Sequence, residues 1–124
     1  MKPTEDVLDR EAALSAALHD PSLLSQLVGL FAGYYPGLLD DIRDAVSAQD
    51  SVQVRETVHR LKGAIGTFHS REAFQTARKL EAMAKDGELA DAMLTYRQLA
   101  EQVLTLAAVL DHLVLELQSE TANG

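Results

Sequence analysis

The 124-residue sequence contains no cysteine and no tryptophan, and only 5% of its residues are aromatic. The lack of cysteine excludes a disulfide framework, thiol chemistry and cysteine-ligated zinc, and it is compatible with a reducing cytoplasm. The abundance of alanine and leucine favours helices packed through aliphatic side chains. With an ordinary apolar content of 47%, the chain is expected to form one domain, residues 1–124, around a single core.

Positive charge is also scarce, because 11 lysines and arginines stand against 19 acidic residues and give a formal net charge of −8. Such an excess of negative charge argues against a nucleic-acid partner. We find no apolar run that approaches the roughly 18 residues of a membrane span, and residues 1–6 show no signal-peptide core. We therefore expect a cytoplasmic protein without nucleic-acid or membrane partners.

The few positive charges are concentrated in the middle of the sequence. Residues 51–79 carry six basic and two acidic side chains, a net charge of +4, whereas residues 1–50 and residues 80–124 each carry a net charge of −6. A local positive field within an acidic protein suits a phosphoryl group or an acidic docking surface. The alternative is a chance fluctuation of charge on solvated helices.

This positive segment contains a strongly patterned helix around His59. At about 100° per residue, one narrow apolar stripe is formed by Val54, Val58, Leu61, Ile65 and Phe68. His59 lies roughly 140° from Val54 at the reference position and so points away from the core. Arg55 and Lys62 lie within one turn of His59 on the same side. The sequence therefore predicts an outward histidine accompanied by positive charge.

Gly63 and Gly66 lie on the same side of this helix as the histidine. Each glycine costs about 1 kcal/mol relative to alanine in a helix interior, so its presence requires a reason beyond the fold. The missing side chains leave the imidazole accessible to a bulky partner. An ordinary surface histidine next to tolerated glycines is the alternative, which the combination with Lys62 disfavours.

Turn signals divide the chain into one short helix and four long ones. The short helix is expected to run from Thr4 or Asp9 to Leu18 and to cap one end of the bundle. Its apolar side contains Leu8, Ala12 and Leu14. The first long helix begins after Asp20 with Pro21 at its first position. Its apolar stripe comprises Leu24, Leu27, Val28, Phe31, Tyr34, Tyr35, Leu38, Ile42 and Val46.

Two features of this first long helix need an interpretation. Pro36 lies inside it, and we expect one bent helix because the stripe keeps its phase across the proline. Tyr34 and Tyr35 are assigned to the core because they follow the helical spacing, and a docking pair is the alternative.

The remaining three helices follow after short connections. Asp50 caps the helix that carries His59, the next helix runs from Ser70 or Arg71 to Lys85, and Gly87 ends it. The last helix is expected to begin near Glu88. It repeats an apolar residue every seven positions, at Leu89, Tyr96, Val103, Leu110 and Leu117, as in a long bundle helix, with a coiled-coil homodimer as the alternative.

Short connections favour antiparallel neighbours within one chain. The sequence therefore predicts an all-α fold, an antiparallel up-down-up-down four-helix bundle with a short N-terminal capping helix. We expect a monomer with a core of about residues 7–118 and a frayed tail at residues 119–124.

The helix after the His59 helix offers a partner for the imidazole. Its apolar stripe contains Ala73, Ala77, Leu80 and Ala84, and Glu81 lies about 70° from the centre of that stripe. From this boundary position a carboxylate can accept a hydrogen bond from the Nδ1 of His59 and fix its tautomer. Arg78, one turn earlier, adds positive potential. A solvent-exposed salt bridge is the alternative role for both side chains.

Glu56 and His59 have the E-x-x-H spacing of di-metal helical bundles. That design requires a second such pair and further inward carboxylates, whereas the sequence contains one copy, on the outward side of its helix. We therefore expect no metal site, and we assign His19, His69 and His112 to the surface. The nucleotide-binding pattern GxxxxGK[ST] is also absent, which argues against a kinase.

Residues 59–63, His-Arg-Leu-Lys-Gly, resemble the H-x-L-K-G signature of histidine-containing phosphotransfer (HPt) domains. Further landmarks of this family follow in the same order, at residues 7–14, Asp20–Pro21, Phe31, Asp50 and Leu80–Glu81. The resemblance covers about residues 7–100. His69 departs from it, because the family commonly has glycine at this position, and the backbone there is expected to differ.

The resemblance implies a four-helix module that carries a phosphoryl group between receiver-domain aspartates. His59 would be the phosphoacceptor, Lys62 would meet the phosphoryl oxygens, and Glu81 would orient the imidazole. Arg78 is expected only to add positive potential. Partner docking is expected at Arg55, Gly63 and Gly66. The module would not be an enzyme with kinase activity of its own and would need no cofactor, since Mg²⁺ would come from the receiver of a response regulator or hybrid kinase. A degenerate adaptor that binds a receiver without accepting phosphate is the alternative.

Overall fold

The computed structural model describes residues 7–123, with side chains described to residue 120. Within this range the chain forms one short and four long helices. They are α2 (Arg10–Ala16), α3 (Pro21–Ser47), α4 (Ser51–Thr67), α5 (Arg71–Lys85) and α6 (Ala92–Asn123). The possible start of the first helix at Thr4 lies outside the described residues.

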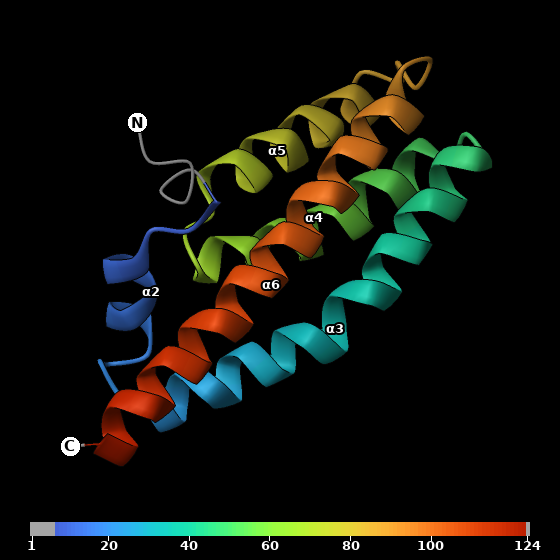
Figure 1. The fold of residues 1–124 in the computed structure, drawn as a ribbon. Helices are drawn as coiled ribbons and strands as arrows, with labels where there is room; N and C mark the ends of the chain where they lie inside the picture. Colours follow the sequence, from blue (N-terminus) through green and yellow to red (C-terminus); the bar gives the residue numbers. More distant parts are fainter. Residues whose placement is uncertain (1–6, 124) are drawn as a thin grey trace.

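The four long helices form a ring in which each one packs against its neighbours in sequence, and α6 closes the ring on α3. Connections of three to six residues join consecutive helices, so neighbours run antiparallel. Figure 1 shows α3 and α6 side by side as the longest helices, with α2 next to the end where α3 begins and α6 ends. The predicted up-down-up-down bundle with a capping helix is confirmed.

Aliphatic side chains from all four long helices meet in the centre. On α4 the whole predicted stripe is buried, and the same holds for the alanine and leucine stripe of α5. Burial of a leucine-sized side chain contributes about 2 kcal/mol, so these stripes fix which side of each helix faces solvent. The rotational setting of α4 therefore follows from its core, and with it the outward direction of His59.

Aspartates begin three of the helices. The carboxylates of Asp9, Asp20 and Asp50 accept hydrogen bonds from backbone N–H groups in the first turns of α2, α3 and α4. Such caps contribute about 1 kcal/mol each. Gly87 follows α5 with a positive φ of 71° and ends it, as the sequence predicts.

The short helix α2 is anchored at its N-terminal end. The guanidinium of Arg10 lies 3.2 Å from the carboxylate of Glu116 on α6, and the backbone N–H of Asp9 donates to the carbonyl of His69 at 3.4 Å. The helix ends at Ala16, two residues before the predicted end, because Leu18 and His19 adopt left-handed backbone angles. Its fully buried residues are Ala13 and Ala17 instead of Ala12 and Leu14.

One prediction for the last helix is wrong. The helix begins at Ala92, not near Glu88, because Leu89 is buried at a turn before the helix, where its carbonyl accepts from the N–H of Ala92. The helix also continues to Asn123, so the described part of the predicted frayed tail is helical. The late start of α6 at Ala92 shows that burial of one leucine in a connection can override a helical sequence pattern.

Tyr34 corrects the prediction for α3. The helix runs uninterrupted through Pro36, yet 48% of Tyr34 is exposed, so this tyrosine does not belong to the core. Tyr35 is half-buried and its ring packs on Phe31, with centroids 5.1 Å apart. The buried stripe of α3 is therefore narrower around the helix than the spacing of its apolar residues indicates.

The apolar content of α6 also differs from the sequence expectation. Residues Ala92–Glu120 are long and apolar enough to cross a membrane by length and composition alone. One side of this helix is the bundle core, however, with Leu99, Val103 and Leu106 fully buried. A core helix of a bundle passes the same test, so this is weak evidence for a membrane span.

Candidate functional site

His59 projects into solvent from the middle of α4, and 71% of its side chain is exposed. The neighbouring Val58 and Leu61 are fully buried and hold the helix against the core. The predicted outward direction of the imidazole is confirmed. An exposed ring on a rigid helix is accessible to a partner while its backbone position stays fixed.

A carboxylate on α5 engages one nitrogen of this imidazole. The Nδ1 of His59 lies 2.9 Å from the Oε2 of Glu81, as the boundary position of Glu81 predicts. An ionised carboxylate only accepts hydrogen bonds, so Nδ1 carries the proton and donates. The lone pair of a neutral ring is then on Nε2, the nitrogen that faces away from this contact.

Lys62 is bound to the same carboxylate. Its Nζ donates to the Oε1 of Glu81 at 2.7 Å, and only 19% of the lysine side chain is exposed. The ammonium also lies 5.8 Å from the centroid of the Phe74 ring on α5, within the range of a cation–π interaction. Lys62 is therefore held between two α5 side chains, which the sequence did not indicate.

The pKa of Glu81 reflects these contacts. Partial burial raises the pKa, whereas the hydrogen bonds from Lys62 and His59 lower it, and their combined effect places the pKa below its ordinary value of 4.5. Glu81 is therefore ionised at neutral pH. One carboxylate thus fixes the tautomer of His59 with one oxygen and pairs with Lys62 through the other.

Phe74 is a site residue that the sequence analysis missed. A Cβ added at Gly66 would lie 3.5 Å from the Phe74 ring, an ordinary van der Waals distance, so Phe74 packs next to this glycine of α4. Phe74 precedes Glu81 by seven residues and therefore shares its face of α5. The signal in the sequence that could have identified Phe74 was an aromatic residue on α5 outside its stripe of alanines.

Two of the predicted docking residues, Arg55 and Gly63, lie on the exposed side of α4. The third, Gly66, is half-buried next to the aromatic ring of α5. Arg55 is exposed, and a Cβ added at Gly63 would have no neighbour within 4 Å. Arg78 is exposed on α5 and forms no ion pair with any described residue. The space beside the imidazole is thus open, while Arg78 forms no hydrogen bond or ion pair with His59.

His69 adopts the backbone conformation that favours glycine. Its φ is +55°, directly after the end of α4. The predicted difference in backbone is therefore wrong: the chain follows the left-handed turn with a histidine in place of glycine. The side chain is exposed, as are those of His19 and His112.

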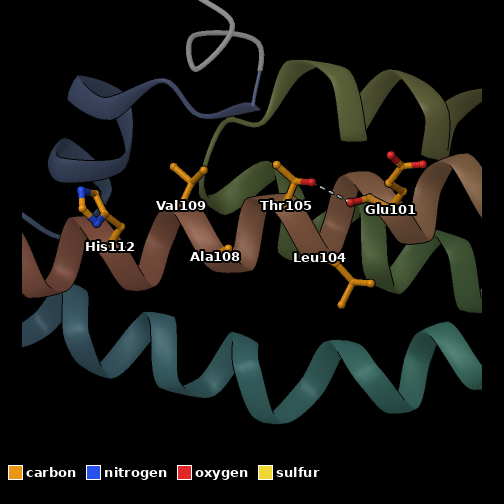
Figure 2. Close-up of a pocket in the computed structure, with 6 residues that line it drawn as sticks. All are labelled: Glu101, Leu104, Thr105, Ala108, Val109 and His112. Carbon is orange, nitrogen blue, oxygen red and sulfur yellow. Dashed lines mark hydrogen bonds between the residues drawn. The ribbon is translucent and has the colours of Figure 1, made fainter.

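Other features of the described residues offer no competing site. No group of three His, Asp or Glu side chains among them is arranged to hold a metal ion, and Glu56 is exposed. An open depression of about 530 Å³ lies along α6, lined by Glu101, Leu104, Thr105, Ala108, Val109 and His112 (Figure 2). This surface belongs to the helix diagonally across the bundle from α4, and its lining is mostly apolar.

Fold and site together define a helical bundle that displays one accessible, oriented histidine. The chain belongs to the Hpt domain family, whose profile matches residues 26–120. HPt domains are phosphotransfer modules of two-component phosphorelays, and they interact with receiver domains of response regulators or hybrid kinases.

Two solved structures share this fold. One is the HPt domain of the Hpt sensor hybrid histidine kinase from Shewanella, with 16% identity, a TM-score of 0.76 and coverage of 90% of this chain and 96% of that one. The other is histidine-containing phosphotransfer protein B from Pseudomonas aeruginosa PAO1, with 21% identity, a TM-score of 0.74 and coverage of 88% and 95%. No curated protein sequence matches significantly.

Proposed function

We propose that this chain is a phosphorelay carrier that accepts a phosphoryl group on His59 from the aspartate of one receiver domain and passes it to the aspartate of another. The observation that carries the proposal is the contact between the exposed His59 ring and Glu81, because it leaves Nε2 unprotonated and accessible. A phosphohistidine carrier needs one free nitrogen and one that is held in place.

The phosphoryl transfer requires no general base. The lone pair on Nε2 of His59 attacks phosphorus, the N–P bond forms, and the P–O bond to the receiver aspartate breaks, so the carboxylate leaves with the electron pair. The ring retains its Nδ1 proton and becomes a cation. Glu81, 2.9 Å away, stabilises this cation, which a neutral acceptor would do less well. The reverse sequence delivers the group to the next receiver.

Lys62 is placed to compensate the charge of the transferred group. Its ammonium is one helical turn from His59 and reaches the phosphoryl oxygens by rotation of its flexible stem away from Glu81. We assign Mg²⁺ to the receiver and expect no cofactor and no kinase activity from this chain. We place the relay in the cytoplasm, with a monomeric carrier.

Docking is expected over the exposed side of α4, where Gly63 leaves room beside the imidazole. On the neighbouring α3, Leu30 and Tyr34 are exposed on one side of Phe31, about 40° apart around the helix. The ring of Phe31 packs on Phe68 at the end of α4. Phe68 is nine residues from His59, about 13 Å along the axis. Because Tyr34 is exposed and does not belong to the core, we assign it the docking role that the sequence left as the alternative.

The test is incubation with receiver domains labelled with ³²P on their aspartate. Acid-labile, base-stable label that His59→Gln abolishes is the expected result. Docking without label supports the adaptor instead and contradicts the carrier. Stoichiometric metal in the purified protein, with no label, would support the metal-binding bundle.

A further inference from the structure

The positive charges of this protein differ in whether they are paired. Away from α4 and α5, Arg10 pairs with Glu116, and Arg43 pairs with Asp40 and Asp44, whereas Arg97 on α6 has no ion pair among the described residues. On α4 and α5 no described acidic group pairs with the remaining cations, which are Arg55, Arg60, Arg71, Arg78, Lys79 and Lys85. All six are exposed. Unpaired charges on a surface keep their full field for a partner.

Lys62 contributes little to this field. Its ammonium lies 2.7 Å from the ionised Glu81, so the two charges nearly cancel beyond their immediate surroundings. Even so, α4 and α5 together carry seven basic and three acidic side chains, a net charge of +4. The rest of the chain then carries −12. The positive field therefore comes from the unpaired side chains.

The packing of α4 on α5 shows which of these cations accompany His59. The contacts of His59 with Glu81 and of Gly66 with Phe74 set an antiparallel register in which residue numbers add to about 140. Arg78 then lies opposite the position of Lys62, and Lys85 lies opposite Arg55. At 100° per residue, Arg78 and Lys85 project on the same side of α5 as Glu81.

Other cations point elsewhere. Lys79 lies about 160° from Glu81 around α5, on the flank away from α4. Arg97 is exposed on α6, the helix diagonally across the bundle, opposite the buried Leu99 and Val103. These two unpaired side chains provide controls of the same charge on other surfaces.

We propose that Arg55, Arg78 and Lys85 form a basic docking surface around His59 that selects receivers with an acidic surface around their aspartate. The inference rests on the proposed function. A receiver concentrates carboxylates where it binds Mg²⁺, so charge complementarity favours this partner. The net charge of −12 on the rest of the chain repels the same partner, so encounters are oriented toward His59.

The experiment measures the association rate constant for the receiver that labels this chain fastest, at ionic strengths from 0.1 to 0.5 M. In this range the screening length is about 10 Å or less, so local charges dominate over the net charge. We expect the double variant Arg55→Gln, Lys85→Gln to associate roughly fivefold more slowly at 0.1 M and with a weaker salt dependence.

The control is the double variant Lys79→Gln, Arg97→Gln, which removes the same charge and should associate at the wild-type rate. Arg55→Lys combined with Lys85→Arg keeps the charge and should retain most of the rate. Equal slowing by both glutamine pairs, or no slowing by either, overturns the docking surface while labelling of His59 still supports the carrier. Failure of every receiver to label the chain overturns both proposals.

Discussion

The Nδ1 of His59 on α4 and the Oε2 of Glu81 on α5 lie 2.9 Å apart, across the most extensive helix interface of the bundle. This distance joins the core to the chemistry of the site. Two stripes of buried aliphatic side chains fix the helices, and the helices bring a carboxylate to the ring. The tautomer of His59 is thus a consequence of packing.

Replacement of Glu81 by glutamine tests the charge at this contact. Because the pKa of Glu81 is lowered on folding, its ionised form stabilises the protein above about pH 4.5, and this stabilisation is lost as pH falls through the folded pKa. Glu81→Gln should therefore cost about 1 kcal/mol at pH 7 and progressively less as pH falls below 4.5. Urea unfolding between pH 3 and 7 measures this. A difference that stays constant over the range contradicts the assignment.

Replacement of Lys62 tests the charge compensation of the phosphoryl group. Lys62→Ala should slow transfer about tenfold, because one cation near the developing charge is lost. Lys79→Ala on the outer flank of α5 is the control and should transfer normally. Rates are measured by rapid quench with labelled receiver. Transfer by Lys62→Ala at the wild-type rate would show that Lys62 is structural.

The open space beside the imidazole is tested at Gly63. Since a Cβ there meets no atom within 4 Å, Gly63→Ala should stabilise α4 by about 0.5–1 kcal/mol. Gly63→Leu should fold equally well but transfer at least tenfold more slowly, because its side chain occupies the approach to Nε2. Thermal unfolding and labelling are measured in parallel. Undiminished labelling of Gly63→Leu would refute the docking role of this glycine.

The turn after α4 stores strain at His69, whose φ is +55°. Glycine adopts this conformation without a Cβ clash, so His69→Gly should raise the free energy of unfolding by about 1 kcal/mol. Gln49→Gly is a matched case, with a φ of 56° after α3. His69→Ala should give no such gain. Equal stability of the glycine and alanine variants would argue against backbone strain at His69.

Sequence periodicity accounts for much of this fold because the helical period is local. The direction of His59 and the boundary position of Glu81 both follow from counting residues around a helix. The pairing of Lys62 with Glu81 was missed because it depends on the register between two helices, which periodicity does not specify. Tyr34 was wrongly assigned to the core for a related reason. The spacing of apolar residues does not show how much of the surface of α3 the neighbouring helices cover.

The connections were the least predictable part. His69 adopts a left-handed turn without glycine, because the surrounding helix ends determine its backbone. Leu89 interrupts the expected start of α6 because its side chain is buried at the turn. Both outcomes are set by tertiary packing, which local patterns do not contain.

Phosphate acceptance by His59 is the central claim, and mapping of the labelled residue tests it most directly. After transfer from a ³²P-labelled receiver, proteolysis and mass spectrometry should place acid-labile phosphate on the peptide that contains His59. His59→Gln should accept none while its helical content stays unchanged, since the ring is exposed. Label that persists in His59→Gln, or that maps to another residue, would contradict this account.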